Sequence, residues 1–208
     1  MKRAEVVLIS TTSSGRLMLA FGVDTISGQL GGWGGRIEQG ENVYEAAARE
    51  LAEESLGLFD FSPRYVERKH LLSARTDRTT CFFLQIPARE MLKFPLAFRA
   101  RHRREEEETE MSGVRILFLG GLRLSCQTNE VYEVDREMIA VAWDSLMRVE
   151  LRLTSNLNAG LHVRDNRSAN HRDHPMLPDR SMGHWFDAVL RSASAGDATS
   201  PGGEDTQE

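Results

Sequence analysis

The chain has 208 residues, a formal net charge of −5 and charged side chains at 27% of its positions. That length fits one domain with elaborations or a tail, and the acidic balance means that RNA binding would need local basic patches. Two cysteines, Cys81 and Cys126, favour a reducing compartment, and the apolar run at 6–9 is too short for a signal-peptide core or a membrane span. We therefore expect a soluble, cytoplasmic protein without a membrane partner, with a nuclear location left open.

Short runs rich in apolar, β-branched and aromatic residues predict the strands. Residues 4–10 and 16–21 flank a Ser/Thr/Gly turn and predict a hairpin. A further strand leads through residues 29–33 into a glycine-rich loop. The remaining predicted strands are 79–86, 114–119 and 138–143, the last followed by the start of a short helix.

One strong helix is predicted over residues 42–55. Asn42 is a good N-cap, and an alanine run favours the helix. Tyr44, Ala48 and Leu51 lie at i, i+4 and i+7 and form an apolar stripe that can face a core. Strands on both sides of this helix, with more helix later in the chain, indicate an α/β sandwich with a mixed sheet.

The polar segments are predicted to lie outside this framework. We expect one domain over 1–191, with polar insertions near 97–112 and 152–182, the second of them a long loop. Residues 183–190 predict a final helix. The composition of 192–208, rich in Ser, Gly, Asp and Glu, predicts a disordered tail.

Three carboxylates are crowded on one face of the predicted helix. Glu50, Glu53 and Glu54 stand at i, i+3 and i+4 and span an arc of roughly 100°. They repel one another unless a positive group lies between them. A divalent cation fits this role, because hard ions take oxygen ligands. The alternative is a solvent-exposed helix that the glutamates only solvate.

The residues around this cluster resemble the signature of the Nudix hydrolases, Gly-x5-Glu-x7-Arg-Glu-hydrophobic-x-Glu-Glu-x-Gly. Gly35, Glu41 and Arg49 match its first part at the expected offsets, and the three glutamates match its second part. The final glycine departs from the pattern, because Leu56 stands at its position and the glycine follows as Gly57. We expect this extra residue to lengthen the last helical turn and to leave the carboxylates in place.

The resemblance implies a Nudix-type α/β/α sandwich and a metal-dependent hydrolase. Its Mg²⁺ or Mn²⁺ would be held by Glu50, Glu53, Glu54 and the backbone carbonyl of Gly34. Arg49 would orient the acidic residues, so the expected catalytic set is Arg49, Glu50 and Glu53. Either of those two glutamates, or one from a loop outside the signature, would act as the general base. The matching structural positions are Gly35, Glu41 and Gly57.

Nudix enzymes often take one more carboxylate from a loop, and several segments supply candidates. These are Glu105 to Glu110, Glu130, Glu133 and Glu137. The basic stretch before the first of them offers Arg99 and Arg101 as phosphate-binding residues, unless the basic and acidic blocks pair with each other or form a solvated loop. Trp33 would stack on a nucleobase or pack under the sheet.

The resemblance leaves the substrate open. The expected reaction is cleavage of a phosphoanhydride bond in a nucleoside diphosphate linked to another moiety. A small nucleotide such as ADP-ribose or a nucleoside triphosphate ranks first, and an mRNA cap ranks second. Diphosphoinositol phosphates and dinucleoside polyphosphates are further substrates in the family. Outside the enzyme class, the alternatives are a module that binds nucleotide or RNA without cleaving it, and a purely structural protein. The oligomeric state is not predicted.

Overall fold

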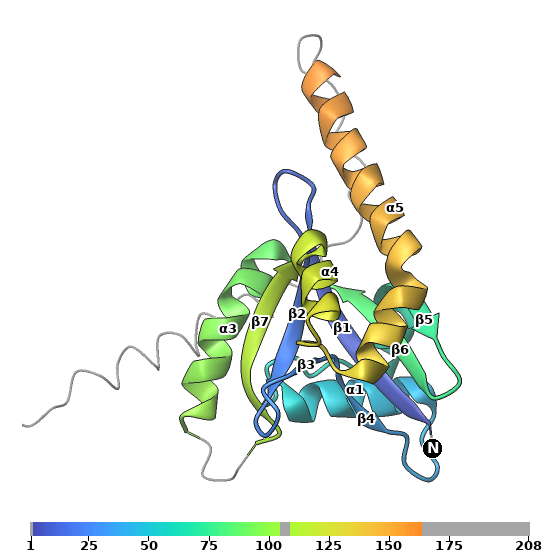
Figure 1. Cartoon of the computed structure of the whole chain (residues 1–208), viewed down its shortest axis with the longest axis vertical. Helices are drawn as coiled ribbons and strands as arrows, with labels where there is room; N and C mark the ends of the chain where they lie inside the picture. The colour runs from blue at the N-terminus through green and yellow to red at the C-terminus, as the bar shows by residue number, and fades with distance from the viewer. Residues whose placement is uncertain (1, 105–108, 164–208) are drawn as a thin grey trace, which may run out of the picture.

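A computed structural model describes residues 2–104 and 109–163 of the chain (Figure 1). Within these residues, seven strands form one mixed sheet: β1 (Arg3–Thr11), β2 (Leu17–Asp24), β3 (Leu30–Gly31), β4 (Trp33–Arg36), β5 (His70–Arg75), β6 (Thr79–Gln85) and β7 (Met111–Phe118). The helices in the same residues are α1 (Val43–Glu54), α2 (Pro63–Lys69), α3 (Ala88–His102), α4 (Leu119–Gln127) and α5 (Glu133–Val163). None of these helices is long and apolar enough to cross a membrane.

Strand β1 lies at the centre of the sheet and organises the rest. It pairs in parallel with β6 and antiparallel with both β2 and β4. The pairing with β2 uses residues 8–11 of β1, and the pairing with β4 uses residues 3–6. Strand β2 also pairs with β3 and β7. The glycines of β4 are therefore held against the N-terminal half of β1, where Glu5 pairs with Gly34.

The sheet is covered by helices on both faces, as the alternation of side chains along β1 requires. Val6 and Leu8 belong to a core that includes buried residues of α1, α2 and α3. Val7 and Ile9 belong to a second core, which includes buried residues of α4 and α5. The mixed-sheet α/β/α sandwich predicted from the sequence is confirmed, as are the first hairpin and the helix over 42–55.

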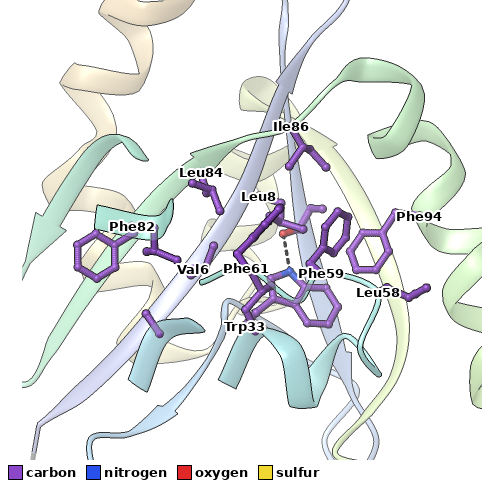
Figure 2. Close-up of a cluster of buried hydrophobic side chains, with 14 of the residues drawn as sticks. Val6, Leu8, Trp33, Leu58, Phe59, Phe61, Phe82, Leu84, Ile86 and Phe94 are labelled. Carbon is purple, nitrogen blue, oxygen red and sulfur yellow. Dashed lines mark hydrogen bonds between the residues drawn. The ribbon is translucent and has the colours of Figure 1, made fainter. Parts of the chain in front are cut away.

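Trp33 lies in the middle of the first core (Figure 2). Its side chain is fully buried, with its ring centroid 5.2 Å from that of Phe94 and 6.1 Å from that of Phe98. The indole N–H donates to the carbonyl of Ala20 at 3.2 Å. Because both the ring and its donor are used within the protein, Trp33 packs under the sheet and offers no face to a nucleobase.

The prediction of a strand at residues 138–143 is wrong, because this segment lies inside α5. Met138, Ile139, Ala142 and Leu146 are all at most 4% exposed and follow a helical spacing. In a strand, Val141 would lie on the same face as the buried Ile139, but it is 56% exposed. The short apolar run is compatible with the two-residue repeat of a strand and with the 3.6-residue repeat of a helix. Packing against the second core selects the helix.

Parts of the predicted polar insertions also belong to helices. Residues 152–163 continue α5, which in Figure 1 projects beyond the sheet, so the loop predicted there is wrong over that part. Residues 97–102 form the last turns of α3. The remainder of the loop, the helix predicted at 183–190 and the tail predicted from 192 lie outside the described residues.

Candidate active site

The N-terminal end of α1 is fixed by its own sequence. The side chain of Asn42 accepts hydrogen bonds from the N–H groups of Tyr44 and Glu45, and the carboxylate of Glu45 accepts one from the N–H of Asn42. This capping box sets where the helix begins. Ala46, Ala47 and Leu51 are fully buried against the sheet. The rotation of the helix about its own axis is therefore fixed. The carboxylates lie on a different side of the helix from these buried residues.

The C-terminal end of α1 shows how the chain accommodates the displaced glycine. The N–H of Leu56 donates to the carbonyl of Glu53 at 3.0 Å, and that of Gly57 to the carbonyl of Ala52 at 2.6 Å. These two bonds form a Schellman motif. Leu56 takes the left-handed position itself, with φ 57°, and Gly57 follows with φ 70°. The expectation of a lengthened last turn is wrong: the helix ends where a glycine at 56 would end it, at the cost of strain in a leucine.

Carboxylates from two distant segments line one pocket at this end of α1. The residues that line it are Glu50, Glu53, Glu54, Leu56, Thr109 and Glu110. The structure thus brings Glu110, from the segment before β7, to the three glutamates of the helix. Glu130 is instead 3.3 Å from Arg115 and accepts from the hydroxyl of Ser125. Glu133 and Glu137 belong to α5, which packs on the opposite face of the sheet.

Burial first, and then repulsion between carboxylates, raises the pKa values of two glutamates in this site. Burial raises the pKa of Glu54 to about 9, although the N–H of Gly34 donates to its carboxylate at 2.7 Å and opposes the rise. The charges of Glu50 and Glu110 raise it further. Burial also raises the pKa of Glu50, against the lowering effect of Arg49. A cation placed among these groups would remove the repulsion.

Arg49 connects the helix to the loop that precedes it. Its guanidinium lies 2.8 Å from Glu41, 3.0 Å from Glu50 and 3.0 Å from Glu53, and it donates to the carbonyl of Arg36 at 3.0 Å. The hydrogen bond with Arg49 is the main reason why the pKa of Glu41 is lowered. Arg49 therefore orients two of the carboxylates and ties the loop to the helix, a geometry that fits the role implied by the resemblance.

Two glycines of β4 are needed because other groups come very close to them. A Cβ on Gly35 would lie 2.3 Å from a carboxylate oxygen of Glu50. A Cβ on Gly34 would lie 2.3 Å from the Cβ of Glu5 and 2.4 Å from the carbonyl of Ala4. Real Cβ atoms essentially never show such distances. The first glycine therefore makes room for a carboxylate, and the second lets β4 lie against β1.

The carbonyl of Gly34, expected to be a metal ligand, is bound by a cation of the protein itself. Arg3 donates to it from Nη2 at 2.8 Å. The N–H of the same glycine donates to Glu54, so both backbone groups of Gly34 have partners. Arg3 was not among the residues singled out from the sequence, because nothing local in the sequence connects it with the glutamates.

The donor chemistry of the pocket fits a hard divalent cation. Four carboxylates supply oxygen ligands of the kind that Mg²⁺ and Mn²⁺ prefer, and the charges of Glu50 and Glu110 add to the rise that burial gives the pKa of Glu54. Within residues 2–104 and 109–163, no three His, Cys, Asp or Glu side chains are already grouped as metal ligands. The carboxylates of α1 are held by Arg49 and Gly34 in this structure, so binding a metal requires them to turn toward it.

Arg99 and Arg101 are both carried by the last turns of α3. Arg99 is exposed, and Arg101 is half-buried with its guanidinium near Gly57. Neither lines the carboxylate pocket. A role for them in holding phosphate stays a prediction.

A buried acidic pair behind the glycines was not found from the sequence. Glu5 on β1 and Asp135 on α5 are 2% and 4% exposed, and Asp135 accepts from the N–H of Gly32 at 2.9 Å. Burial, and then the charge of Asp135, raise the pKa of Glu5 well above its usual value. The one signal in the sequence is a glutamate inside the apolar run of residues 4–10.

No protein-family profile and no curated protein matches this chain. Among solved structures, it is similar to an Ap4A hydrolase from C. elegans in a binary complex, with 15% identity over 76% of this chain and 99% of that chain and a TM-score of 0.38. A mutT/nudix family protein from Listeria innocua aligns with 12% identity over 72% of this chain and 96% of its own, with a TM-score of 0.49. A bifunctional NMN adenylyltransferase/ADP ribose pyrophosphatase from Francisella tularensis, complexed with AMP and Mn ion, aligns with 12% identity over 70% and 42% of the two chains and a TM-score of 0.43. The solved structures to which this chain is similar thus include MutT/Nudix family proteins.

Proposed function

We propose that this chain is a Nudix-type pyrophosphohydrolase that cleaves the phosphoanhydride bond of a nucleoside diphosphate linked to another moiety, with a small nucleotide as its substrate. One observation carries the proposal: four carboxylates from two separate segments line a single pocket beside the guanidinium of Arg49. A helix that the glutamates merely solvated would have no reason to place Glu110 opposite them.

The residues that would hold Mg²⁺ or Mn²⁺ are Glu50, Glu53 and Glu54, with Glu110 as the additional carboxylate. A bound divalent ion would neutralise charge on the diphosphate and lower the pKa of an attacking water. The protein's own part is to hold the carboxylates in place. Arg49 orients Glu50 and Glu53, and the N–H of Gly34 fixes Glu54.

The intact carboxylate set favours catalysis over binding alone. A Nudix-like module that only binds nucleotide or RNA usually lacks one of these carboxylates, whereas all of them are present here. Burying Glu54 raises its pKa to about 9, which reflects a cost to the protein that a purely structural helix would have no need to bear.

The test is an assay of phosphoanhydride cleavage with Mg²⁺ or Mn²⁺, in which the nucleoside monophosphate product is separated by chromatography, over a panel of nucleoside diphosphate derivatives, nucleoside triphosphates and capped RNA. We expect turnover of a small nucleotide, with a loss of at least 100-fold in Glu54→Gln. Glu67→Gln is the matched control, because Glu67 is an exposed glutamate on α2. Turnover of no substrate would contradict the enzyme assignment, and full activity in Glu54→Gln would contradict the site.

A melting experiment separates the two classes that are not enzymes. A binding module and an enzyme should both gain thermal stability with Mn²⁺, because a ligand that binds only the folded state stabilises it. A purely structural protein should show no shift. Absence of a shift in the parent chain would remove the metal from the proposal.

A further inference from the structure

The fourth carboxylate of the pocket is held in a different way from the other three. The glutamates of α1 are bound through their side chains, by the guanidinium of Arg49 and the N–H of Gly34. Glu110 directly precedes β7 and is bound through its backbone, because its carbonyl accepts from the N–H of Thr25 at 2.9 Å. The place of its carboxylate in the pocket therefore depends on what holds the chain at this point.

Thr109 is the residue that ties this part of the chain to its surroundings. Its carbonyl accepts from the hydroxyl of Thr25 at 2.7 Å, so the turn after β2 binds two successive carbonyls. Its own hydroxyl lies 2.7 Å from the carbonyl of Met111 and 2.9 Å from Nδ1 of His102. Thr109 also lines the carboxylate pocket, next to Glu110. Any movement of Thr109 would therefore move the fourth carboxylate.

The two contacts of this hydroxyl determine which ring nitrogen of His102 carries a proton. A carbonyl oxygen can only accept, so the proton of the hydroxyl goes to Met111. The hydroxyl has no second proton, and Nδ1 of His102 must donate to it. His102 thus holds Thr109 through an N–H, and a side chain without a donor at this place cannot replace it.

His102 is itself held by the first core. It lies in the last turn of α3, and its ring stacks on that of Phe98, with centroids 5.9 Å apart and an angle of 19° between the planes. Phe98 is fully buried, and its ring centroid is 6.1 Å from that of Trp33. Close packing of this kind keeps the imidazole in one orientation. A continuous series of contacts therefore runs from the core through His102 to Thr109.

We propose that His102 is a positioning residue of the carboxylate pocket. Its Nδ1–H holds the hydroxyl of Thr109, and this bond fixes where the carboxylate of Glu110 meets a bound cation. The inference rests on the proposed function, in which Glu110 is the additional metal ligand. Groups that bind behind a metal ligand control its orientation, and their loss typically lowers metal affinity about 10- to 100-fold.

Calorimetric titration with Mn²⁺ tests the donor and the hydroxyl separately. His102→Phe keeps a ring that can stack on Phe98 but removes the donor, and Thr109→Val keeps the shape of the side chain but removes the hydroxyl. We expect each change to weaken Mn²⁺ binding about 10-fold. His102→Asn and Thr109→Ser should bind within about 3-fold of the parent chain, because asparagine still offers an N–H near the position of Nδ1 and serine still offers a hydroxyl.

His70→Phe is the matched control. Nδ1 of His70 also has a partner, the carbonyl of Val66 at 2.9 Å, and its ring stacks on Tyr44. His70 does not line the carboxylate pocket, so this variant should bind Mn²⁺ like the parent chain. An equal loss of affinity in His70→Phe would mean that removing any packed imidazole weakens metal binding, and the inference would be overturned.

A double variant distinguishes positioning from a general loss of structure. If His102 acts through Glu110, His102→Phe should weaken Mn²⁺ binding no further in a chain that already carries Glu110→Gln. Fully additive losses would overturn the inference. Thermal melts in EDTA check that each variant folds. Should His102→Phe fail to fold, Thr109→Val and its conservative counterpart Thr109→Ser decide the question without a change in α3.

The outcomes separate this inference from the hydrolase assignment. If the parent chain binds Mn²⁺ and both His102→Phe and Thr109→Val bind it equally well, the inference is overturned and the proposed function stands. The expected order of affinities without turnover of any nucleotide would refute the proposed function and leave the positioning role standing. A parent chain that does not bind Mn²⁺ would overturn both.

Discussion

Replacing Gly35 with alanine should displace one carboxylate while leaving the fold in place. The new Cβ would lie 2.3 Å from an oxygen of Glu50, whereas ordinary van der Waals contacts begin at 3.4 Å. The carboxylate must therefore retreat by about 1 Å. It is the far end of a side chain, so it can move without shifting the backbone. A displacement of about 1 Å in a catalytic group costs roughly 100-fold in rate.

The assay is kcat/KM for the best nucleotide substrate, with Mn²⁺ affinity from calorimetry as a second reading. We expect both to fall in Gly35→Ala, with the thermal midpoint of the metal-free protein little changed. Gly120→Ala is the control, because an added Cβ there meets nothing within 4 Å. Full activity and unchanged metal affinity in Gly35→Ala would refute the reasoning that this glycine exists to seat Glu50.

Three further predictions follow from the same structure. Arg49→Lys keeps the charge but loses the forked guanidinium that donates to both Glu41 and the carbonyl of Arg36. We expect kcat/KM to fall about 30-fold. A fall of less than about 3-fold would contradict the orienting role of Arg49. In EDTA, the pKa of Glu54 lies near 9 in the folded state against 4.5 for the free side chain, so stability should decline as pH rises through that window. Urea melts from pH 5 to 9 should show this slope in the parent and a flatter one in Glu54→Gln, and equal slopes would count against the burial of that carboxyl. Phe94→Ala removes a fully buried ring and should lower the free energy of unfolding, measured by urea denaturation, by about 3–5 kcal/mol. Leu92 is 65% exposed, so Leu92→Ala should lower it by less than about 1 kcal/mol. Similar losses in the two variants would contradict the core described here.

The parts of the fold that could be predicted from the sequence are those that depend only on residues close together in the chain. The apolar run of β1 and the N-cap at Asn42 each need only a few neighbouring positions, and both are present. The prediction for residues 138–143 was wrong because a run of six apolar residues fits a strand as well as a helix. Only the contacts of Met138 and Ala142 with the second core distinguish the two.

The same limit applies to the site. Glu50, Glu53 and Glu54 are one helical turn, so their convergence follows from spacing alone. Glu110 lies more than fifty residues away in the chain, and several other glutamates were equally good candidates from the sequence. Arg3 reaches Gly34 through the pairing of β1 with β4. No local pattern encodes that pairing, so neither partner could be assigned before the strands were placed.

The Glu5–Asp135 pair alters how many protons the molecule carries. The formal charge of −5 counts every carboxylate as ionised. Burial raises the pKa of both members of this pair, and the pair sits at the junction of β1 with the first turn of α5. At any pH between the ordinary pKa of these groups and their raised pKa, folding takes up protons from the solution, since the unfolded chain ionises both groups there. The native protein is accordingly less acidic than its composition, and in isoelectric focusing it should band at a higher pH than the same chain in urea.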